Sequence, residues 1–293
     1  MNRPGSAWFA VALWTLVVLS FTLPWVAGCG GDSDGSSRST GSASVTAPAK
    51  GSLLAQIRER GSLIVGTAIT KPFLFHDPRT NDLMGLDVDV ASAIATRLGV
   101  KVEWREMPFA SLIPALQTGK LDMTIGAMHI TDERRGAVDF ASPYLDTGLV
   151  MVTRPEEAKR FRKAEDVGGA RVGVKIGATG DQLAQDLITR GVKLERKEYK
   201  ETLESLLDLE IGRIDVVFND FLNTLAYRKE RPSKIEIVKD AEGQVLFLSR
   251  AGLGMAVRKG CPDLLGPIDD ALRKMKADGT IQKLYGKWLE ASR

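Results

Sequence analysis

The sequence has few of the residues that build metal and disulfide sites. Among 293 residues it has two cysteines, Cys29 and Cys261, and two histidines, His76 and His129. No CxxC pair or Cys/His cluster occurs, which excludes a structural zinc site of the usual ligand spacing. No phosphate-binding loop and no Ser-His-Asp arrangement is evident either. We therefore predict no metal, no cofactor and no catalytic residues.

A strong charge of one sign is also lacking. The chain carries 40 basic and 37 acidic residues, for a formal net charge of +3, and aromatic residues make up only 6%. No basic run with interleaved aromatics stands out, so no nucleic-acid partner is expected. Hydrophobic residues make up 44% and charged residues 26%. This composition and length suit a soluble body of two modest lobes.

The one long hydrophobic run lies at the N-terminus, over residues 7–27. Its length fits either a cleaved signal or a retained membrane helix. Val26-Ala-Gly-Cys29 resembles the bacterial lipobox, which implies cleavage before Cys29 and a lipid on its thiol. Residues 30–50 are rich in Gly, Ser, Thr and Ala, typical of a flexible tether. We expect a signal peptide over 1–28, a tether over 29–52, and an exported protein at the periplasmic or cell-surface face, membrane-anchored through lipidated Cys29.

The first half of the body alternates short strands with amphipathic helices. Leu86, Val90, Ile94 and Leu98 recur at helical spacing before Gly99, which predicts a helix over 86–98. The other elements predicted here are strands at 63–66, 100–104 and 121–125 and a helix at 109–117. This βαβα order is typical of a largely parallel sheet covered on both faces.

The same order restarts after Pro143-Tyr144. The predicted strands are 171–174, 192–195, 215–218 and 254–257, and the predicted helices are 181–190, 202–209, 221–228, 264–276 and 281–289. Two α/β units of similar size are therefore expected.

Two segments carry a family resemblance: FASLIPALQTGKLD at 109–122 and HITDERRGAVDFASPY at 129–144. Together they resemble family 3 of the bacterial extracellular solute-binding proteins, the amino-acid receptors of ABC importers. The resemblance implies a two-lobed periplasmic-binding-protein type II fold, each lobe a mostly parallel sheet flanked by helices. Lobe one would comprise 53–146 plus 252–293, and lobe two 147–251. A monomer that closes on an amino acid or related carboxylate and delivers it to ABC permease membrane subunits is implied.

The resemblance also assigns ligand-binding roles to residues of both lobes. Arg134 would clamp the ligand α-carboxylate with its planar guanidinium, or would be a solvated arginine at a helix start. Thr131 and Ala127 would complete that pocket. Asp220 would accept the ligand ammonium, or cap the following helix. Phe109 would lie against the ligand side chain, or be an ordinary core residue.

A turn in lobe two supplies further candidates. Gly177 and Thr179 lie in a turn just before the helix predicted at 181–190, and this turn would present backbone N–H groups to an anion. Lys175 matches a lysine of the glutamine-binding branch that meets the ligand's side-chain carbonyl; the alternative is a lysine at the rim. Asn219 is the remaining candidate in this lobe. A polar or acidic, glutamine- or glutamate-like ligand follows from the resemblance.

The chain departs from the family pattern in two places. The loop Gly66–Phe73 is one residue shorter, with Ala68 where the family has an acid and Thr70 near its aromatic. His129 replaces a serine or threonine, and it would reshape the pocket, bond the ligand, or be satisfied by backbone. These changes favour a dicarboxylate, or an amino acid held by Asp220 alone, over a basic amino acid.

Two other classes share this fold. Cyclohexadienyl or arogenate dehydratases use an acid in the lobe-two turn, near Asp181, which would need a pKa raised by burial to act as a general acid. The alternative for Asp181 is a first-turn acid favoured by the helix dipole. A sensor ectodomain would continue into a membrane helix and kinase, whereas this sequence ends at Arg293. We predict a freestanding binding protein that is not an enzyme.

Overall fold

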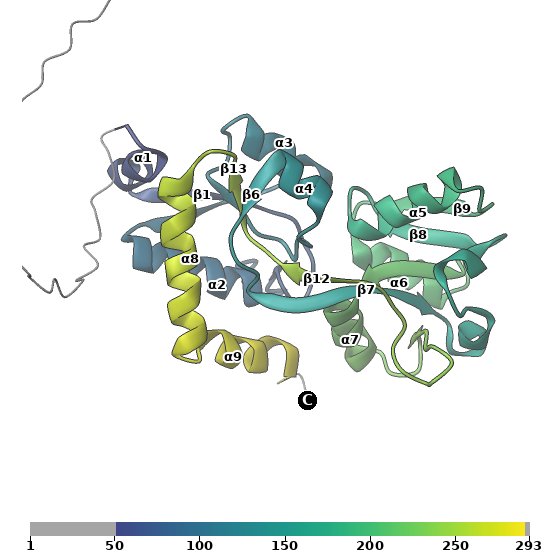
Figure 1. Cartoon of the computed structure of the whole chain (residues 1–293). Coiled ribbons are helices and arrows are strands. Elements are labelled where there is room, and N and C mark those ends of the chain that lie inside the picture. The colour runs from purple at the N-terminus through teal and green to yellow at the C-terminus, as the bar shows by residue number, and fades with distance from the viewer. Residues whose placement is uncertain (1–50, 291–293) are drawn as a thin grey trace, which may run out of the picture. The chain divides into compact units, whose positions relative to one another are not determined.

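The computed structural model describes residues 51–290, which form two sheets with their own helices and cores (Figure 1). The predicted signal peptide, the lipidated Cys29 and most of the predicted tether lie outside the described residues. Within the described part of the chain, no helix is long and apolar enough to cross a membrane.

The first sheet has five strands in the order β4-β1-β5-β13-β6. Strand β1 (Ser62–Thr67) is parallel to β4 (Lys101–Glu106) and β5 (Met123–Thr124), whereas β13 (Ala256–Arg258) is antiparallel to β5 and β6 (Val138–Phe140). We call this sheet and its covering elements the first lobe. Those elements are α1 (Leu53–Arg60), α2 (Leu86–Leu98), η1 (Phe109–Ser111), α3 (Leu112–Gln117), α4 (Asp132–Ala137), α8 (Pro262–Ala277), α9 (Thr280–Tyr285), the π-helical turn η4 (Gly286–Glu290) and the small hairpin of β2 (Phe75–His76) and β3 (Leu83–Met84).

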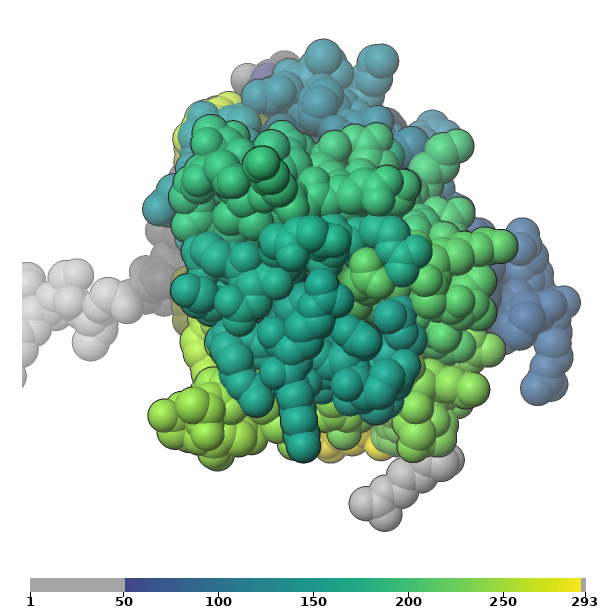
Figure 2. Space-filling view, turned by 90° about the vertical axis from the view of Figure 1, so that its right-hand side faces the viewer, coloured from purple at the N-terminus to yellow at the C-terminus, as the bar shows by residue number. Residues whose placement is uncertain are grey.

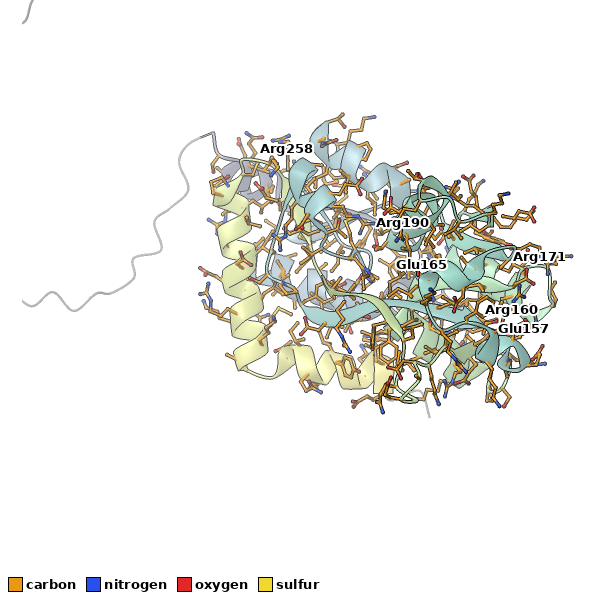
Figure 3. The ribbon with its side chains drawn as sticks, turned by 45° about the vertical axis from the view of Figure 1, so that its right-hand side comes forward. Glu157, Arg160, Glu165, Arg171, Arg190 and Arg258 are labelled. Atoms are coloured by element: carbon orange, nitrogen blue, oxygen red, sulfur yellow. The ribbon has the colours of Figure 1, made fainter. Side chains whose placement is uncertain are left out.

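The second sheet follows the order β11-β7-β10-β8-β9, with β12 also paired to β7. Strands β8 (Arg171–Lys175), β9 (Glu195–Tyr199) and β10 (Val216–Asp220) are parallel. With β11 (Glu236–Ile237) and its helical elements this sheet forms the second lobe, whose teal and green residues make up most of the surface in Figure 2. Its helical elements are η2 (Pro155–Arg160), η3 (Ala164–Val167), α5 (Thr179–Thr189), α6 (Thr202–Glu210) and α7 (Phe221–Glu230). Ion pairs Glu157–Arg160 and Glu165–Arg190 lie on its surface (Figure 3).

Two antiparallel strands run from one lobe to the other: β7 (Leu145–Thr153) and β12 (Phe247–Leu253) (Figure 1). Strands that return across this connection enter a sheet from the opposite end, so they pair antiparallel with their neighbours. The expectation of mostly parallel sheets therefore needs a correction: each sheet is parallel along its strand–helix–strand units and antiparallel beside the crossing.

Helix α2 forms over the predicted residues because its apolar residues share one face. Leu86, Val90 and Ile94 are fully buried, and Leu98 is 5% exposed. Because these residues recur every four positions, one stripe of the helix faces the core of the first lobe. Gly99 ends the helix at φ +77, a left-handed conformation in which glycine pays no Cβ penalty. The predicted range of 86–98 is confirmed.

Two predicted elements lie elsewhere. The strand predicted at 192–195 is β9, at Glu195–Tyr199, because the chain is still turning after α5: the Val192 N–H bonds Leu187 O. Val192 packs against the second lobe's core from that turn. The helix predicted to reach residue 289 ends as an α-helix at Tyr285 and continues as the π-helical turn η4.

Candidate functional site

A cavity between the two lobes brings together most of the predicted ligand-binding residues. The cavity has a volume of about 50 Å³ that water can occupy, which is room for a few water molecules. Nine of the eleven predicted residues line it: Thr70, Phe109, Ala127, His129, Arg134, Lys175, Thr179, Asn219 and Asp220. The other two, Thr131 and Gly177, do not line the cavity but position residues that do.

Arg134 lies in α4, a helix of the first lobe. Thr131 caps this helix, accepting a bond from the Arg134 N–H at 3.3 Å. The guanidinium donates to His129 O at 2.7 Å and, across to the second lobe, to Gly177 O at 3.1 Å. It also lies 5.3 Å from the centre of the Phe109 ring.

Burial lowers the pKa of Arg134 to about 10, against the raising effect of nearby Glu133. Among the ion pairs of residues 51–290 none involves Arg134. The group is therefore a partly buried cation that faces carbonyl oxygens of both lobes, rather than a freely solvated surface arginine.

Asp220 ends β10 and caps α7, accepting a bond from the Asn223 N–H at 2.9 Å, so the capping interpretation is confirmed. Its other oxygen accepts two more bonds, from Thr147 Oγ1 at 2.7 Å and from His129 Nε2 at 2.9 Å. The His129 ring is thus held by a carboxylate of the opposite lobe, and the alternative of a histidine satisfied by backbone is wrong. Its Nδ1 is buried and has no partner among the described residues.

Lys175 ends β8 and reaches across to the first lobe. Its ammonium donates to Ile69 O at 3.0 Å, to Thr70 Oγ1 at 2.9 Å and to Glu201 Oε2 at 3.2 Å. Burial lowers its pKa, partly offset by the charge of Glu201. Lys175 is 7% exposed, so the alternative of a lysine at the rim is wrong. The Lys175 nitrogen also lies 5.3 Å from the Phe109 ring centre.

Phe109 is 8% exposed and packs in a core cluster of the first lobe while lining the cavity. The core and cavity interpretations therefore both describe its position. Both Lys175 and Arg134 flank its ring, so the aromatic face is bounded by two cations.

The turn before α5 corrects one prediction. The Gly177 N–H does not face the cavity as a free donor, because it donates to the Asp181 carboxylate at 2.8 Å. The cavity is instead lined by Thr179 and Gly180, the first two residues of α5, whose N–H groups have no intrahelical partner. Gly177 has φ +74, and an added Cβ would meet Ala110 of the first lobe at 2.8 Å. Glycine here permits the close approach of the two lobes.

Asp181 does not have the environment of a general acid. Burial is the largest effect and raises its pKa, but its bonds from Arg196, from the Gly177 N–H and from Gln185 outweigh burial, and the net shift is downward. The Arg196 Nε lies 2.6 Å from its Oδ1. A carboxyl held ionised by an arginine cannot readily donate a proton at neutral pH.

Asp87 is a buried carboxylate beneath the site, and the sequence analysis assigned it no role. It accepts bonds from Tyr144 OH at 2.7 Å and from the Ala127 N–H at 2.8 Å. Ala127 has φ +49, a left-handed conformation rare for a residue with a Cβ. Asp87 therefore holds a strained cavity-lining residue in place.

Burial, the largest effect, raises the pKa of Asp87 to about 6 despite its hydrogen bonds; the charge of Asp220 acts in the same direction.

Asn219 lines the cavity, but its amide points into the second lobe. It donates to Asn223 Oδ1 at 2.6 Å and to Thr224 Oγ1 at 2.9 Å. The sequence analysis missed other lining residues, of which Thr202 and Ser205 could have been found. Both are polar residues on the buried face of α6, beside Leu206 and Leu209. Such a polar interruption of an apolar stripe is a usable signal.

Comparisons with known proteins agree with this architecture. The sequence matches the bacterial extracellular solute-binding proteins, family 3, over residues 63–291. It is 30% identical over 239 residues to the L-cystine-binding protein TcyJ of Escherichia coli (strain K12), covering 82% of this chain and 86% of that protein.

Two solved structures are similar. An ancestral arginine-binding protein bound to arginine has a TM-score of 0.71 and 40% identity, over 78% of this chain and 98% of that one. The ancestral amino acid-binding protein AncCDT-1, a precursor of cyclohexadienyl dehydratase, has a TM-score of 0.71 and 35% identity, over 81% and 100%. The fold is thus the two-lobed type II fold of periplasmic amino-acid-binding proteins, and the relative and both solved structures are named as binding proteins. The chain belongs to the bacterial extracellular solute-binding proteins, family 3.

Proposed function

We propose that this protein captures a polar or acidic amino acid, glutamine- or glutamate-like, between its lobes and delivers it to an ABC permease. The observation that carries the proposal is Arg134: a partly buried guanidinium that lines the cavity and has no acidic partner among the described residues. A carboxylate is the partner whose two oxygens match the donors of a guanidinium.

The other polar groups of the cavity favour a ligand with an acidic or amide side chain over a ligand with a basic side chain. Lys175 lines the same cavity, where its ammonium donates to Thr70 and pairs with Glu201, and the first-turn N–H groups of Thr179 and Gly180 add positive potential there. The one acid of the cavity wall that a basic side chain would need, Asp220, already accepts three bonds. The relatives named for arginine and cystine support an amino acid as the ligand. The cations of this cavity favour a polar or acidic side chain on that amino acid.

Ligand capture would work by closure. We infer lobe one as 53–146 plus 252–293 and lobe two as 147–251, since β7 begins at Leu145 and β12 ends at Leu253. Arg134 and Phe109 belong to the first, and Lys175 and Asp220 to the second. A ligand that bonds both sets stabilises the closed state by its differential affinity.

We further propose that the protein is a monomer, exported by the signal peptide of residues 1–28 and anchored to the membrane through a lipid on Cys29. The lipobox-like sequence before Cys29 supports this. Cell fractionation tests it: the wild-type protein should sediment with membranes and Cys29→Ser should not. Equal membrane association of both variants would contradict the lipid anchor.

Calorimetry tests the ligand proposal. The protein as expressed, in a mild non-ionic detergent, would be titrated with each amino acid and with glutarate. Glutamate or glutamine should bind with a Kd well below the millimolar range. Failure of every amino acid and dicarboxylate to bind a protein with intact circular dichroism would contradict the proposal.

A further inference from the structure

The ammonium-binding position of the cavity is already partly filled by the protein itself. Asp220 accepts bonds from Thr147 and from the Asn223 N–H, both of which come from near it in the sheet and helix. The third bond, from His129 Nε2, comes from the other lobe, 91 residues away in the sequence. A carboxylate has about four lone-pair sites, so three donors leave it about one.

The His129 ring is bound on that side alone. Because Asp220 is an acceptor, the Nε2 atom must carry the proton of this bond. The other ring nitrogen is buried without a partner among the described residues, which costs free energy. The side chain is 5% exposed, against 11% for that of Asp220, so water competes little for either group.

The rest of the wall offers a ligand ammonium little else. Ala68 stands 1% exposed in the first loop, where a longer acidic side chain would supply a second carboxylate. Asp87 lies under the Ala127 backbone with both oxygens engaged, one by Tyr144 and one by the Ala127 N–H. Glu201 is engaged by Lys175.

We propose that His129 is a specificity-determining residue: it donates to Asp220 in place of a ligand α-ammonium, so that the site derives its affinity from the ligand's carboxylates. This inference rests on the proposed function. A carboxylate ligand without an α-amino group leaves the His129–Asp220 bond intact. An α-amino acid must displace that bond or share the one remaining position.

Glutamate and glutarate form the matched ligand pair, because they differ only in the α-ammonium. Calorimetry would compare the wild-type protein, His129→Ser and the control His76→Ser, all as expressed and in detergent. The control replaces the other histidine, which pairs with Glu106 away from the lining of the cavity. The ratio of the two Kd values is the informative quantity, since any effect of a substitution that is common to both ligands cancels in it.

The wild-type and His76→Ser proteins should bind both ligands within about tenfold of each other, since one charge-assisted bond is worth about that factor. In His129→Ser the ratio should shift toward glutamate by about tenfold or more, the return of one such bond. An unchanged ratio, or a shift toward glutarate, would overturn the inference while leaving the proposed function standing. Failure of both ligands, and of glutamine and the other amino acids, to bind any variant would overturn the proposed function and this inference with it.

Discussion

Replacing Asp87 by asparagine should change how the stability of the protein depends on pH. The carboxyl is fully buried, and its pKa in the folded protein is about 6, raised from 3.8 chiefly by burial. Between those two values the folded protein holds a proton that the unfolded chain has released. Stability therefore falls as pH rises through this window.

The size of the effect follows from the shift. A difference of about two pKa units, at about 1.4 kcal/mol each, gives about 3 kcal/mol lost between pH 4 and pH 7. The asparagine amide can still accept the bond from the Ala127 N–H and can donate to the Tyr144 oxygen, but it carries no charge. The free energy of unfolding of Asp87→Asn, relative to the wild-type protein, should therefore rise by about 3 kcal/mol over this range.

Urea unfolding followed by tryptophan fluorescence at pH 4, 5, 6 and 7 measures this difference. Asp89→Asn is the matched control: it removes a carboxylate from the same helix turn, where Asp89 bonds Lys287 and Trp288 near the surface. A difference between Asp87→Asn and the wild-type protein that stays constant with pH would refute the assignment of a raised pKa to Asp87.

Three other variants test the site and its scaffold. Arg134→Ala should weaken binding of glutamate or glutamine by about 100-fold in calorimetry, the loss of a bidentate charge-assisted contact, while Arg135→Ala, exposed on the same helix, should leave affinity unchanged; equal effects would contradict the clamp. Gly180→Ala should destabilise the fold in urea and weaken binding, because its Cβ would lie 2.4 Å from a backbone oxygen of β10. Gly136→Ala in α4, where nothing lies within 4 Å of the added Cβ, should keep the stability of the wild-type protein or gain up to about 1 kcal/mol; an equal loss in both variants would argue against that geometry. Incubation of the wild-type protein and Asp181→Asn with prephenate or arogenate should yield no product, and turnover dependent on Asp181 would contradict a pure binding role.

The periodic parts of the fold were predictable because local sequence decides them. Helix α2 follows from four apolar residues at helical spacing and a closing glycine, and the strand–helix alternation gave both sheets. The antiparallel strands were not predictable in the same way, because β12 pairs with β7 across about 100 residues of sequence. Nothing in the local pattern of either strand states which way its neighbour runs.

The sequence predicted most of the residues that line the site, but it did not predict which residues they contact. Motif position marked Arg134, Lys175 and Asp220, and all three line the cavity. Their partners come from the opposite lobe or from distant elements: Ile69 for Lys175 and His129 for Asp220. Such pairings depend on how the lobes close, which no periodicity encodes.

Native mass spectrometry of protein purified without added ligand tests the central claim most directly. The wild-type protein should carry a bound small molecule that, released by acid and identified, is an amino acid with a polar or acidic side chain or the related carboxylate. Arg134→Ala should carry none. A ligand without a carboxylate group, or the same ligand retained in Arg134→Ala, would contradict the account.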